Sequence, residues 1–189
     1  MRIAGVDEVG RGTLAGPVMA AAVILPGSVP EEQQCIINDS KLLSESQRER
    51  AFTWLTDWCV GYSVGESSAA EIDAIGIVPA TKLAMSRAIS SLQTQPDHLI
   101  IDAVSLETIT IPQTSIIKAD SRSQSVAAAS IIAKVTRDRL MANVFDSKYP
   151  GYGFAAHKGY GTVIHISALQ KLGASPIHRR TFNPVKEIL

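Results

Sequence analysis

The feature that most constrains the fold of this chain is an apolar run near its start that ends abruptly in two acids. Residues 3–6 form a short apolar segment bounded by turn signals, which is typical of a buried central strand. Asp7 and Glu8 follow at its carboxyl end. Ligands bind at that edge of an open α/β sheet, so the sequence predicts that these carboxylates hold cations. An isolated acid pair usually lies in a solvated turn, and the preceding strand argues against that interpretation here.

An arginine between two glycines follows the acids. Gly10 and Gly12 have no side chains, so backbone N–H groups around Arg11 can come close to a bulky group such as a sugar or a phosphate. The segment therefore predicts a contact with nucleic acid beside the carboxylates.

Length and composition indicate one domain spanning residues 1–189. With 46% hydrophobic residues the chain can bury a substantial core, and a second catalytic domain does not fit in this length. The formal net charge is zero, so any surface for nucleic acid must be a local patch. Cys35 and Cys59 form no CxxC motif, which suggests buried thiols in a reducing compartment, and we expect the cytoplasm.

No segment has the pattern of an export signal or a membrane span. The acids at positions 7 and 8 interrupt any signal-peptide core, and the apolar run 14–25 is too short and contains Pro17. We therefore expect no membrane association.

The order of apolar runs and helix signals predicts an α/β fold class, a mixed sheet of about five strands covered by helices. After residues 3–6, the predicted strands are 18–25, 61–67, 98–103 and 114–118. The predicted helices begin at capping residues or prolines: one at the capping box of Ser44 and Gln47, one at Pro79, one at the box 121–124 that runs to about Ala142, and one capped by Thr162 that runs to Leu172.

The predicted helix that follows residue 124 has a distinctive composition. Its first half, residues 126–133, consists of small and apolar residues and should lie tightly against the sheet. Its second half is polar, and Lys134 and Asp138 have the spacing of a solvated ion pair without a catalytic role.

Two further acids come at the ends of apolar strands. Asp102 ends the run that begins at residue 99, and Asp120 follows residues 114–118 at the mouth of a helix. Taken alone, Asp102 could bond a neighbouring turn and Asp120 could be a favourable charge at a helix N-terminus. Together with Asp7 and Glu8, they form an oxygen-rich set that suits Mg²⁺ or Mn²⁺ and not zinc. Two such ions support in-line displacement at phosphorus, which is nuclease chemistry.

Six ordered motifs, which span nearly the whole chain, closely resemble bacterial ribonuclease HII. They are Asp7-Glu8-Val-Gly-Arg-Gly12 with Leu14-Ala-Gly-Pro-Val18, Asp39-Ser-Lys41, Lys118-Ala-Asp120, Ala127-Ala-Ala-Ser-Ile-Ile-Ala-Lys134, Lys158-Gly-Tyr-Gly-Thr162 and His178-Arg-Arg-Thr-Phe182. The resemblance implies a ribonuclease H-like fold with a C-terminal helical extension. It also implies an endonuclease that cuts RNA in RNA–DNA hybrids, and cuts 5′ of single ribonucleotides in duplex DNA with Mg²⁺ or Mn²⁺, leaving 3′-hydroxyl and 5′-phosphate ends.

The resemblance assigns roles to particular acids. The family's metal ligands fall on Asp7, Glu8, Asp102 and Asp120, with Asp7 expected to bridge two ions. The family often has glycine after the third acid, and this chain has Ala103, which places the local turn in question.

The family's recognition of the ribose falls on Gly10, Arg11, Gly12 and Tyr160. A tyrosine has a hydroxyl and a flat ring, and we expect Tyr160 to stack on the deoxyribose 3′ to the ribonucleotide. The alternative is a tyrosine of the core or of a loop.

Further contacts with phosphates are less specific. Lys41 matches the family's phosphate contact. The side chains that could add backbone contacts, or simply form a solvated basic tail, are His157, Lys158, Arg179 and Arg180.

Two rival interpretations differ from this one. Another metal nuclease or recombinase of the same fold, such as ribonuclease HI or an integrase core, would not carry these motifs in this order. Ribonuclease HIII has an extra N-terminal domain, whereas this sequence begins on the catalytic strand. A binding module without activity would not need all four acids.

We expect a monomer, and the residues 187–189 show no recognisable clamp-binding tail.

Overall fold

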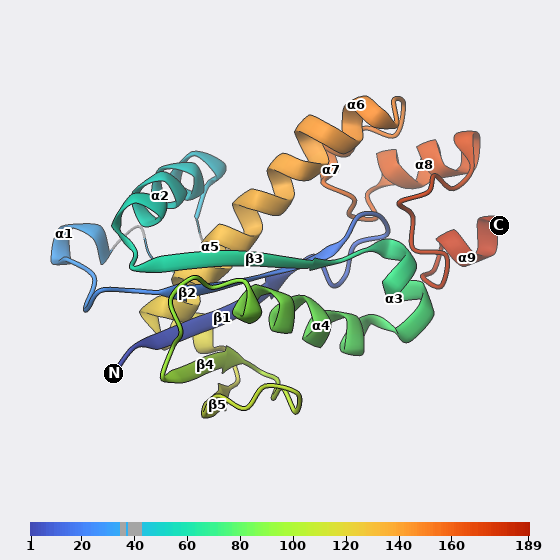
Figure 1. Cartoon of the computed structure of the whole chain (residues 1–189). Helices are drawn as coiled ribbons and strands as arrows, with labels where there is room; N and C mark the ends of the chain where they lie inside the picture. Colours follow the sequence, from blue (N-terminus) through green and yellow to red (C-terminus); the bar gives the residue numbers. More distant parts are fainter. Residues whose placement is uncertain (35–36, 38–42) are drawn as a thin grey trace.

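A mixed five-stranded sheet forms the centre of the molecule (Figure 1). The computed structural model describes residues 1–34, 37 and 43–189. The strand order is β3-β2-β1-β4-β5, with β1 antiparallel to β2 and parallel to β4. The strands are β1 (Ile3–Val9), β2 (Val18–Ile24), β3 (Gly61–Ser67), β4 (His98–Asp102) and β5 (Gln113–Ile116). The predicted α/β class with a mixed five-stranded sheet is confirmed.

Helices cover both faces of this sheet. On one face lie α5 (Gln124–Arg139) and α2 (Glu45–Trp58), and on the other lies α4 (Ile77–Ser90) (Figure 1). Strand β2 is buried along its whole length because its alternate residues enter the two cores: Ala22 packs on the α4 side and Ala21 on the α5 side. This burial explains the uninterrupted apolar run from residue 18 to residue 24.

The helix α5 approaches β1 more closely than side chains would normally permit. A Cβ atom placed on Gly5 would lie 2.1 Å from the backbone carbon of Ser125. The small residues of 126–133 are buried nearly all round, as their composition predicted. The absence of a side chain at Gly5 therefore sets the distance between the central strand and this helix.

The chain departs from the prediction between β5 and α5. The predicted strand 114–118 is observed as β5, which ends two residues earlier because Lys118 adopts a left-handed conformation with φ of 56°. The short 3-10 helix η1 (Ala119–Ser121) follows and carries Asp120.

The predicted capping box at 121–124 is wrong. Helix α5 begins at Gln124, with Ser123 as its N-cap. The hydroxyl of Ser121 donates to the carbonyl of Lys118, and the Gln124 side chain accepts from the backbone N–H of Val29. Both side chains therefore bond outside the helix, because η1 occupies the residues that the capping box would need.

Other boundaries also differ from the prediction. Helix α4 begins two residues before Pro79, and α3 (Ala69–Ile75) was not predicted although Ser68 and Glu71 form its capping box. The glycine- and tyrosine-containing segment 149–161 includes the short helix α7. The remaining elements are α1 (Glu31–Gln34), the π-helical turn η2 (Leu140–Phe145), α6 (Asp146–Lys148), α7 (Phe154–His157), α8 (Val163–Leu172) and α9 (Val185–Ile188). The helices from α7 onward form the predicted C-terminal helical extension (Figure 1).

In the described ranges, no helix combines the length and the apolar character that crossing a bilayer requires.

Cys59 at the end of α2 is half-buried, so the expected burial of the thiol is only partial. Cys35 lies outside the described residues.

The residue after the third acid adopts a conformation that suits glycine. Ala103 has φ of 58°, and the Val104 N–H donates to the carbonyl of Asp102 across it at 2.8 Å. The turn that the family often builds with glycine is thus formed here by an alanine, at the expense of backbone strain.

Replacing Ala103 with glycine should stabilise the protein. Relief of the left-handed conformation contributes about 1–2 kcal/mol, and the greater freedom of glycine in the unfolded chain offsets about half of it. We expect the free energy of unfolding, measured by urea denaturation, to rise by about 0.5–1 kcal/mol. The control Ala70→Gly, in α3, should lower it; a decrease for both variants would contradict the strain at Ala103.

Candidate active site

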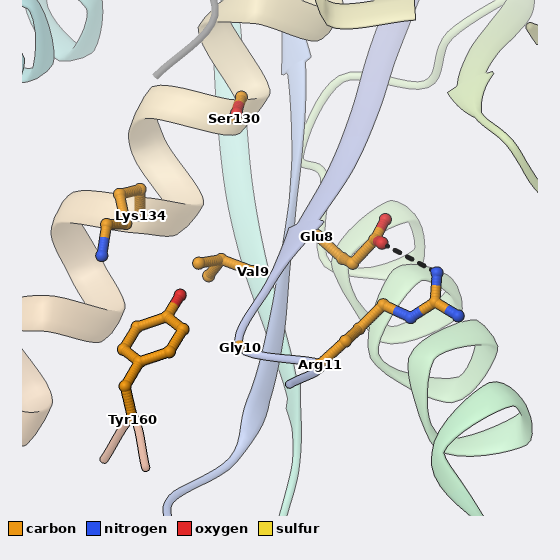
Figure 2. Close-up of a pocket in the computed structure, with 7 residues that line it drawn as sticks. All are labelled: Glu8, Val9, Gly10, Arg11, Ser130, Lys134 and Tyr160. Carbon is orange, nitrogen blue, oxygen red and sulfur yellow. Dashed lines mark hydrogen bonds and ion pairs between the residues drawn. The ribbon is translucent and has the colours of Figure 1, made fainter. Parts of the chain in front are cut away.

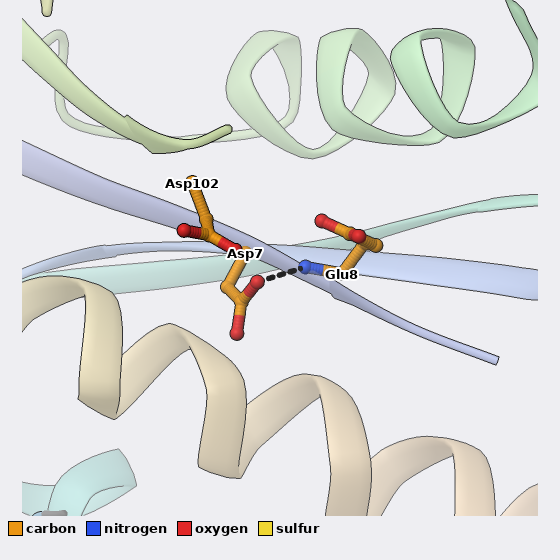
Figure 3. A group of neighbouring side chains, drawn as sticks. All are labelled: Asp7, Glu8 and Asp102. Carbon is orange, nitrogen blue, oxygen red and sulfur yellow. Dashed lines mark hydrogen bonds between the residues drawn. The ribbon is translucent and has the colours of Figure 1, made fainter. Parts of the chain in front are cut away.

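Three of the predicted acids come together at the carboxyl ends of two parallel strands. The register pairs Val6 of β1 with Ile101 of β4, which brings the next residues, Asp7 and Asp102, side by side. Figure 3 shows these carboxylates beside Glu8. One oxygen from each of the three side chains lies within 4.8 Å of the others. The prediction that distant acids gather at this edge is confirmed for these three residues.

Asp7 is the most buried member of the cluster, at 6% exposed. Its Oδ1 accepts a hydrogen bond from the Glu8 N–H at 2.8 Å (Figure 3), and the Ser130 hydroxyl of α5 also bonds to it. Burial, reinforced by the charges of Glu8 and Asp102, raises its pKa from 3.8 to about 8. Three carboxylates this close favour a proton on Asp7 at neutral pH.

Glu8 points toward the opposite side of the strand. Its carboxylate forms an ion pair with Arg11, with Oε1 and Nη1 3.3 Å apart (Figure 2). Burial raises the pKa of Glu8, while the Arg11 guanidinium opposes the shift. The arginine between the two glycines therefore contacts the acid cluster directly.

Asp102 links the cluster to the turn that carries the fourth acid. Its Oδ1 accepts a hydrogen bond from the Ala119 N–H at 2.8 Å. Asp120, the next residue, is buried, and its Oδ1 accepts from the Ser121 N–H at 2.9 Å. Asp120 is not part of the group whose oxygens lie within 4.8 Å, so its place among the metal ligands stays a prediction.

The chemistry of the cluster suits a hard divalent cation. All three members are carboxylates, and oxygen ligands are those that Mg²⁺ and Mn²⁺ prefer. A cation at this edge would replace the proton that burial favours on Asp7 and would neutralise the repulsion among the three charges.

A cavity of about 220 Å³ adjoins the acids (Figure 2). It brings together Gly10 and Arg11 with Tyr160, which lies 150 residues later in the sequence. Tyr160 is 40% exposed, so the alternative of a core tyrosine is wrong, whereas that of a loop tyrosine agrees with its position between α7 and α8. Gly12 is exposed in the turn after Arg11. The residues lining the cavity are Glu8, Val9, Gly10, Arg11, Ser130, Lys134 and Tyr160.

Lys134 also lines this cavity. The sequence interpretation had given this lysine no role in the site. Its ammonium bonds Asp138 at 2.8 Å, as predicted, but the two side chains are only 19% and 15% exposed, so the pair is not well solvated. The Nζ atom also lies 5.5 Å from the centre of the Tyr160 ring. The available signal was the spacing from Ser130, since residues four apart share one face of a helix.

The basic residues near the end of the chain are not a uniform surface. Arg179 is fully buried, and His157 is 8% exposed with its ring bonded to the Tyr152 carbonyl and the Gly159 N–H. The prediction that these two contact phosphates is therefore wrong, because their polar atoms are committed to the interior. Lys158 is half-buried and Arg180 is exposed, so both stay candidates. Lys41 lies outside the described residues.

Two histidines hold the segment that presents Tyr160. His178 Nδ1 accepts from the Ser175 N–H, so its proton lies on Nε2 and is donated to His165 Nε2 at 3.0 Å. His165 Nδ1 then donates to the Tyr160 carbonyl at 2.9 Å. Burial lowers the pKa of His165 and lowers that of His178 to about 4, so both rings are neutral at physiological pH. This chain of bonds fixes the backbone of Tyr160.

Comparison with known proteins agrees with this geometry. The family model described as Ribonuclease HII matches residues 4–185. Ribonuclease HII of Chloroflexus aurantiacus is 54% identical over 99% of this chain and 89% of its own length.

Two solved structures resemble the fold. Ribonuclease H2 from Pyrococcus horikoshii has a TM-score of 0.80 at 30% identity, covering 100% of this chain and 97% of its own. RNase HII from Archaeoglobus fulgidus, solved in a complex with PCNA, has a TM-score of 0.76 at 28% identity. The match covers 90% of this chain and 88% of the Archaeoglobus chain.

These likenesses confirm the expected ribonuclease H-like fold and extend over almost the whole chain. With three acids already gathered at the sheet edge, they lead to one assignment. This chain belongs to the ribonuclease HII family, the endonucleases that degrade the RNA of RNA–DNA hybrids.

Proposed function

We propose that this endonuclease also recognises single ribonucleotides embedded in duplex DNA and cuts on their 5′ side, leaving 3′-hydroxyl and 5′-phosphate ends. The observation that carries the proposal is the cavity shared by Glu8, Arg11 and Tyr160. A nucleotide whose sugar lay between Tyr160 and the turn that begins at Gly10 would have its phosphate near Glu8, the member of the acid cluster that lines the cavity. Recognition and cleavage then occur within one nucleotide, so a run of ribonucleotides is not required.

The ribose is read by the turn that follows β1. Only the 2′-hydroxyl distinguishes RNA from DNA at one position, and the exposed residues Arg11 and Gly12 offer it their backbone N–H groups. Tyr160 stacks on the deoxyribose of the next nucleotide, which selects the junction where RNA returns to DNA. The exposure of its ring, with the Lys134 ammonium beside it, supports this role.

Asp7, Glu8 and Asp102 would hold the divalent cations, with Asp120 as the fourth ligand. When bound, two such ions activate a water and stabilise the departing 3′ oxygen. The chain's own residues prepare the site: Ser130 orients Asp7 through its hydroxyl, and Arg11 holds the Glu8 carboxylate. The N–H of Ala119 fixes Asp102.

We further propose that the enzyme is a cytoplasmic monomer. The Cys59 thiol is free, which fits a reducing compartment. Lys41, Lys158 and Arg180 supply contacts with phosphates of the bound duplex, since cations without a substrate-specific geometry bind the backbone of either strand.

A duplex with one ribonucleotide tests the proposed cleavage. In the presence of Mg²⁺ or Mn²⁺ we expect a single cut on the 5′ side of that residue, and no cut in the all-DNA duplex of the same sequence. EDTA should abolish the reaction, and Asp102→Asn should reduce the rate by a factor of 10² or more, because one cluster carboxylate loses its charge. The products are resolved on a denaturing gel.

The same assay distinguishes the rival functions. Cleavage only of a continuous RNA–DNA hybrid would indicate an enzyme that needs a run of ribonucleotides. Binding without cleavage of either substrate would indicate an inactive binding module. Either result would contradict the proposal.

Replacing Tyr160 with alanine should affect recognition and not folding. The ring is 40% exposed, so we expect the free energy of unfolding to fall by less than about 1 kcal/mol. Cleavage of the single-ribonucleotide duplex should fall at least about fivefold, because a stacking contact is worth about 1–3 kcal/mol. Steady-state rates and urea denaturation of the same preparation measure the two effects; unchanged cleavage would reject the stacking role.

Binding of the cation should release a proton at neutral pH. The pKa of Asp7 is about 8 without metal, so Asp7 is protonated at pH 7 and must ionise to become a ligand. We expect calorimetry in buffers of different ionisation enthalpy to show nearly one proton released at pH 7, and almost none at pH 9.5. The affinity for Mn²⁺ should weaken about tenfold for each pH unit below 8.

The raised pKa of Asp7 should also make the stability of the metal-free protein decrease as pH rises. The folded pKa of Asp7 lies above the unfolded value of 3.8, so its contribution is fully present below pH 3.8 and is lost as pH rises through 8. In Asp7→Asn both the proton release and this loss of stability should disappear. Proton release that persists in this variant would place the titrating group elsewhere.

A further inference from the structure

Two buried arginines hold the turn that carries the predicted ribose contacts. Arg179 donates to the carbonyl of Gly10 at 2.6 Å, to that of Arg11 at 2.8 Å, and twice to that of Gly16 at 3.0 and 3.1 Å. Its guanidinium is fully buried. Every carbonyl in this set lies in the segment between β1 and β2.

Arg137 of α5 holds the same segment from the other side. It donates to the carbonyls of Ala15 and Pro17 and to the Thr13 hydroxyl, each at 2.9 Å. The Thr13 hydroxyl in turn donates to the Gly10 carbonyl at 3.1 Å. A fourth bond, to the Lys158 carbonyl at 2.9 Å, reaches the segment that presents Tyr160. Arg137 thus joins both sides of the cavity to one helix.

These guanidiniums are an unusual choice for the interior. Burial lowers the pKa of Arg137 to about 10 and that of Arg179 to about 9, so both keep their charge at neutral pH. Among the described residues no carboxylate forms an ion pair with either of them, and backbone carbonyls accept from most of their donors. Apolar side chains would fill the same space without desolvating a charge. The arrangement is suited to orienting backbone, which apolar packing cannot do.

The orientation of the carbonyls determines that of the N–H groups. In a planar trans peptide the C=O and the N–H point in opposite directions. The carbonyls of Gly10 and Arg11 point inward to Arg179, so the N–H groups of Arg11 and Gly12 point outward. Both residues are exposed, and neither N–H donates to another described residue. Gly10 permits this arrangement, since a Cβ there would lie 2.3 Å from Arg137 Nε.

We propose that Arg137 and Arg179 are positioning residues for ribonucleotide recognition, which aim the N–H groups of Arg11 and Gly12 at the ribose without touching the substrate. This inference rests on the proposed function, because it needs the turn to read the 2′-hydroxyl. The planar fork of arginine is required, since one ammonium cannot reach carbonyls on several sides at once. Lysine at either position keeps the charge and loses the orientation.

The test measures the preference for a ribose and not the overall activity. Arg137→Lys and Arg179→Lys are compared with wild type and with Arg139→Lys, a matched control on α5 whose exposed guanidinium pairs with Glu49. Each protein is titrated in EDTA with two duplexes that differ only in one ribonucleotide. The ratio of the two dissociation constants reports recognition of the 2′-hydroxyl, and a general loss of folded protein does not change it. Thermal unfolding of each variant is recorded in parallel.

We expect wild type and Arg139→Lys to bind the ribonucleotide duplex more tightly by up to about 25-fold. Each of the two N–H donors contributes a factor of about five through one hydrogen bond to the 2′-hydroxyl. For Arg137→Lys and Arg179→Lys, the ratio of the two dissociation constants should lie within about twofold of one, which means almost no preference. Wild-type preference that persists in these variants overturns the positioning role and leaves the proposed function intact. Absence of preference in wild type overturns both.

Thr13→Val keeps the inference testable if a lysine variant does not fold. It removes one acceptor of Arg137 and the bond from Thr13 to Gly10 while preserving the shape of a buried side chain. We expect the ratio of the two dissociation constants to fall about fivefold, because one hydrogen bond contributes a factor of about five. An unchanged ratio in Thr13→Val would count against the arginine network as the device that orients the turn.

Discussion

The close packing of α5 on β1 determines the geometry of the whole active site. Gly5 allows the helix backbone to come within contact of the strand, and Asp7 lies two residues further along the same face. From this position α5 supplies Ser130 to Asp7, Lys134 to the cavity and Arg137 to the turn after the strand. These residues are four and three apart and form one stripe along the helix. A small shift of the helix would move all three together.

The sequence was sufficient to locate the acids because strand ends in a parallel pair meet at one edge of the sheet. The register of β1 and β4 follows from apolar runs that are easy to recognise, so Asp7 and Asp102 were found without a structure. Asp120 was harder to place: η1 and the left-handed Lys118 intervene before α5, and nothing in the local pattern announces them. The resemblance to ribonuclease HII supplied Tyr160, whose neighbourhood no periodicity could reveal.

The buried arginines show why the rest could not be predicted. Arg137 follows an apolar half-helix and begins a polar one, and such a residue normally faces water. Arg179 lies in a basic stretch that has the composition of a solvated tail. Their burial depends on carbonyls from residues 10–17, which are distant in sequence and whose orientation is a property of the folded turn. Local patterns do not record contacts of this kind.

The site also shows how function opposes stability. Burial, reinforced by the neighbouring acids, raises the pKa of Asp7, and Ala103 carries a left-handed backbone beside Asp102. Both features are unfavourable for the isolated fold, and both lie at or next to a member of the carboxylate cluster. The extensive burial of α5 and β2 compensates for them elsewhere in the sheet.

The bond between Arg179 and the Gly10 carbonyl joins residues 169 positions apart. A ribosome synthesises the chain from its amino terminus, so Gly10 emerges early and must wait for nearly the entire polypeptide before its partner exists. The catalytic strand can pair with its neighbours during translation, whereas the turn that we propose reads the ribose is completed only afterwards. A growing chain therefore acquires its acids before it acquires this turn.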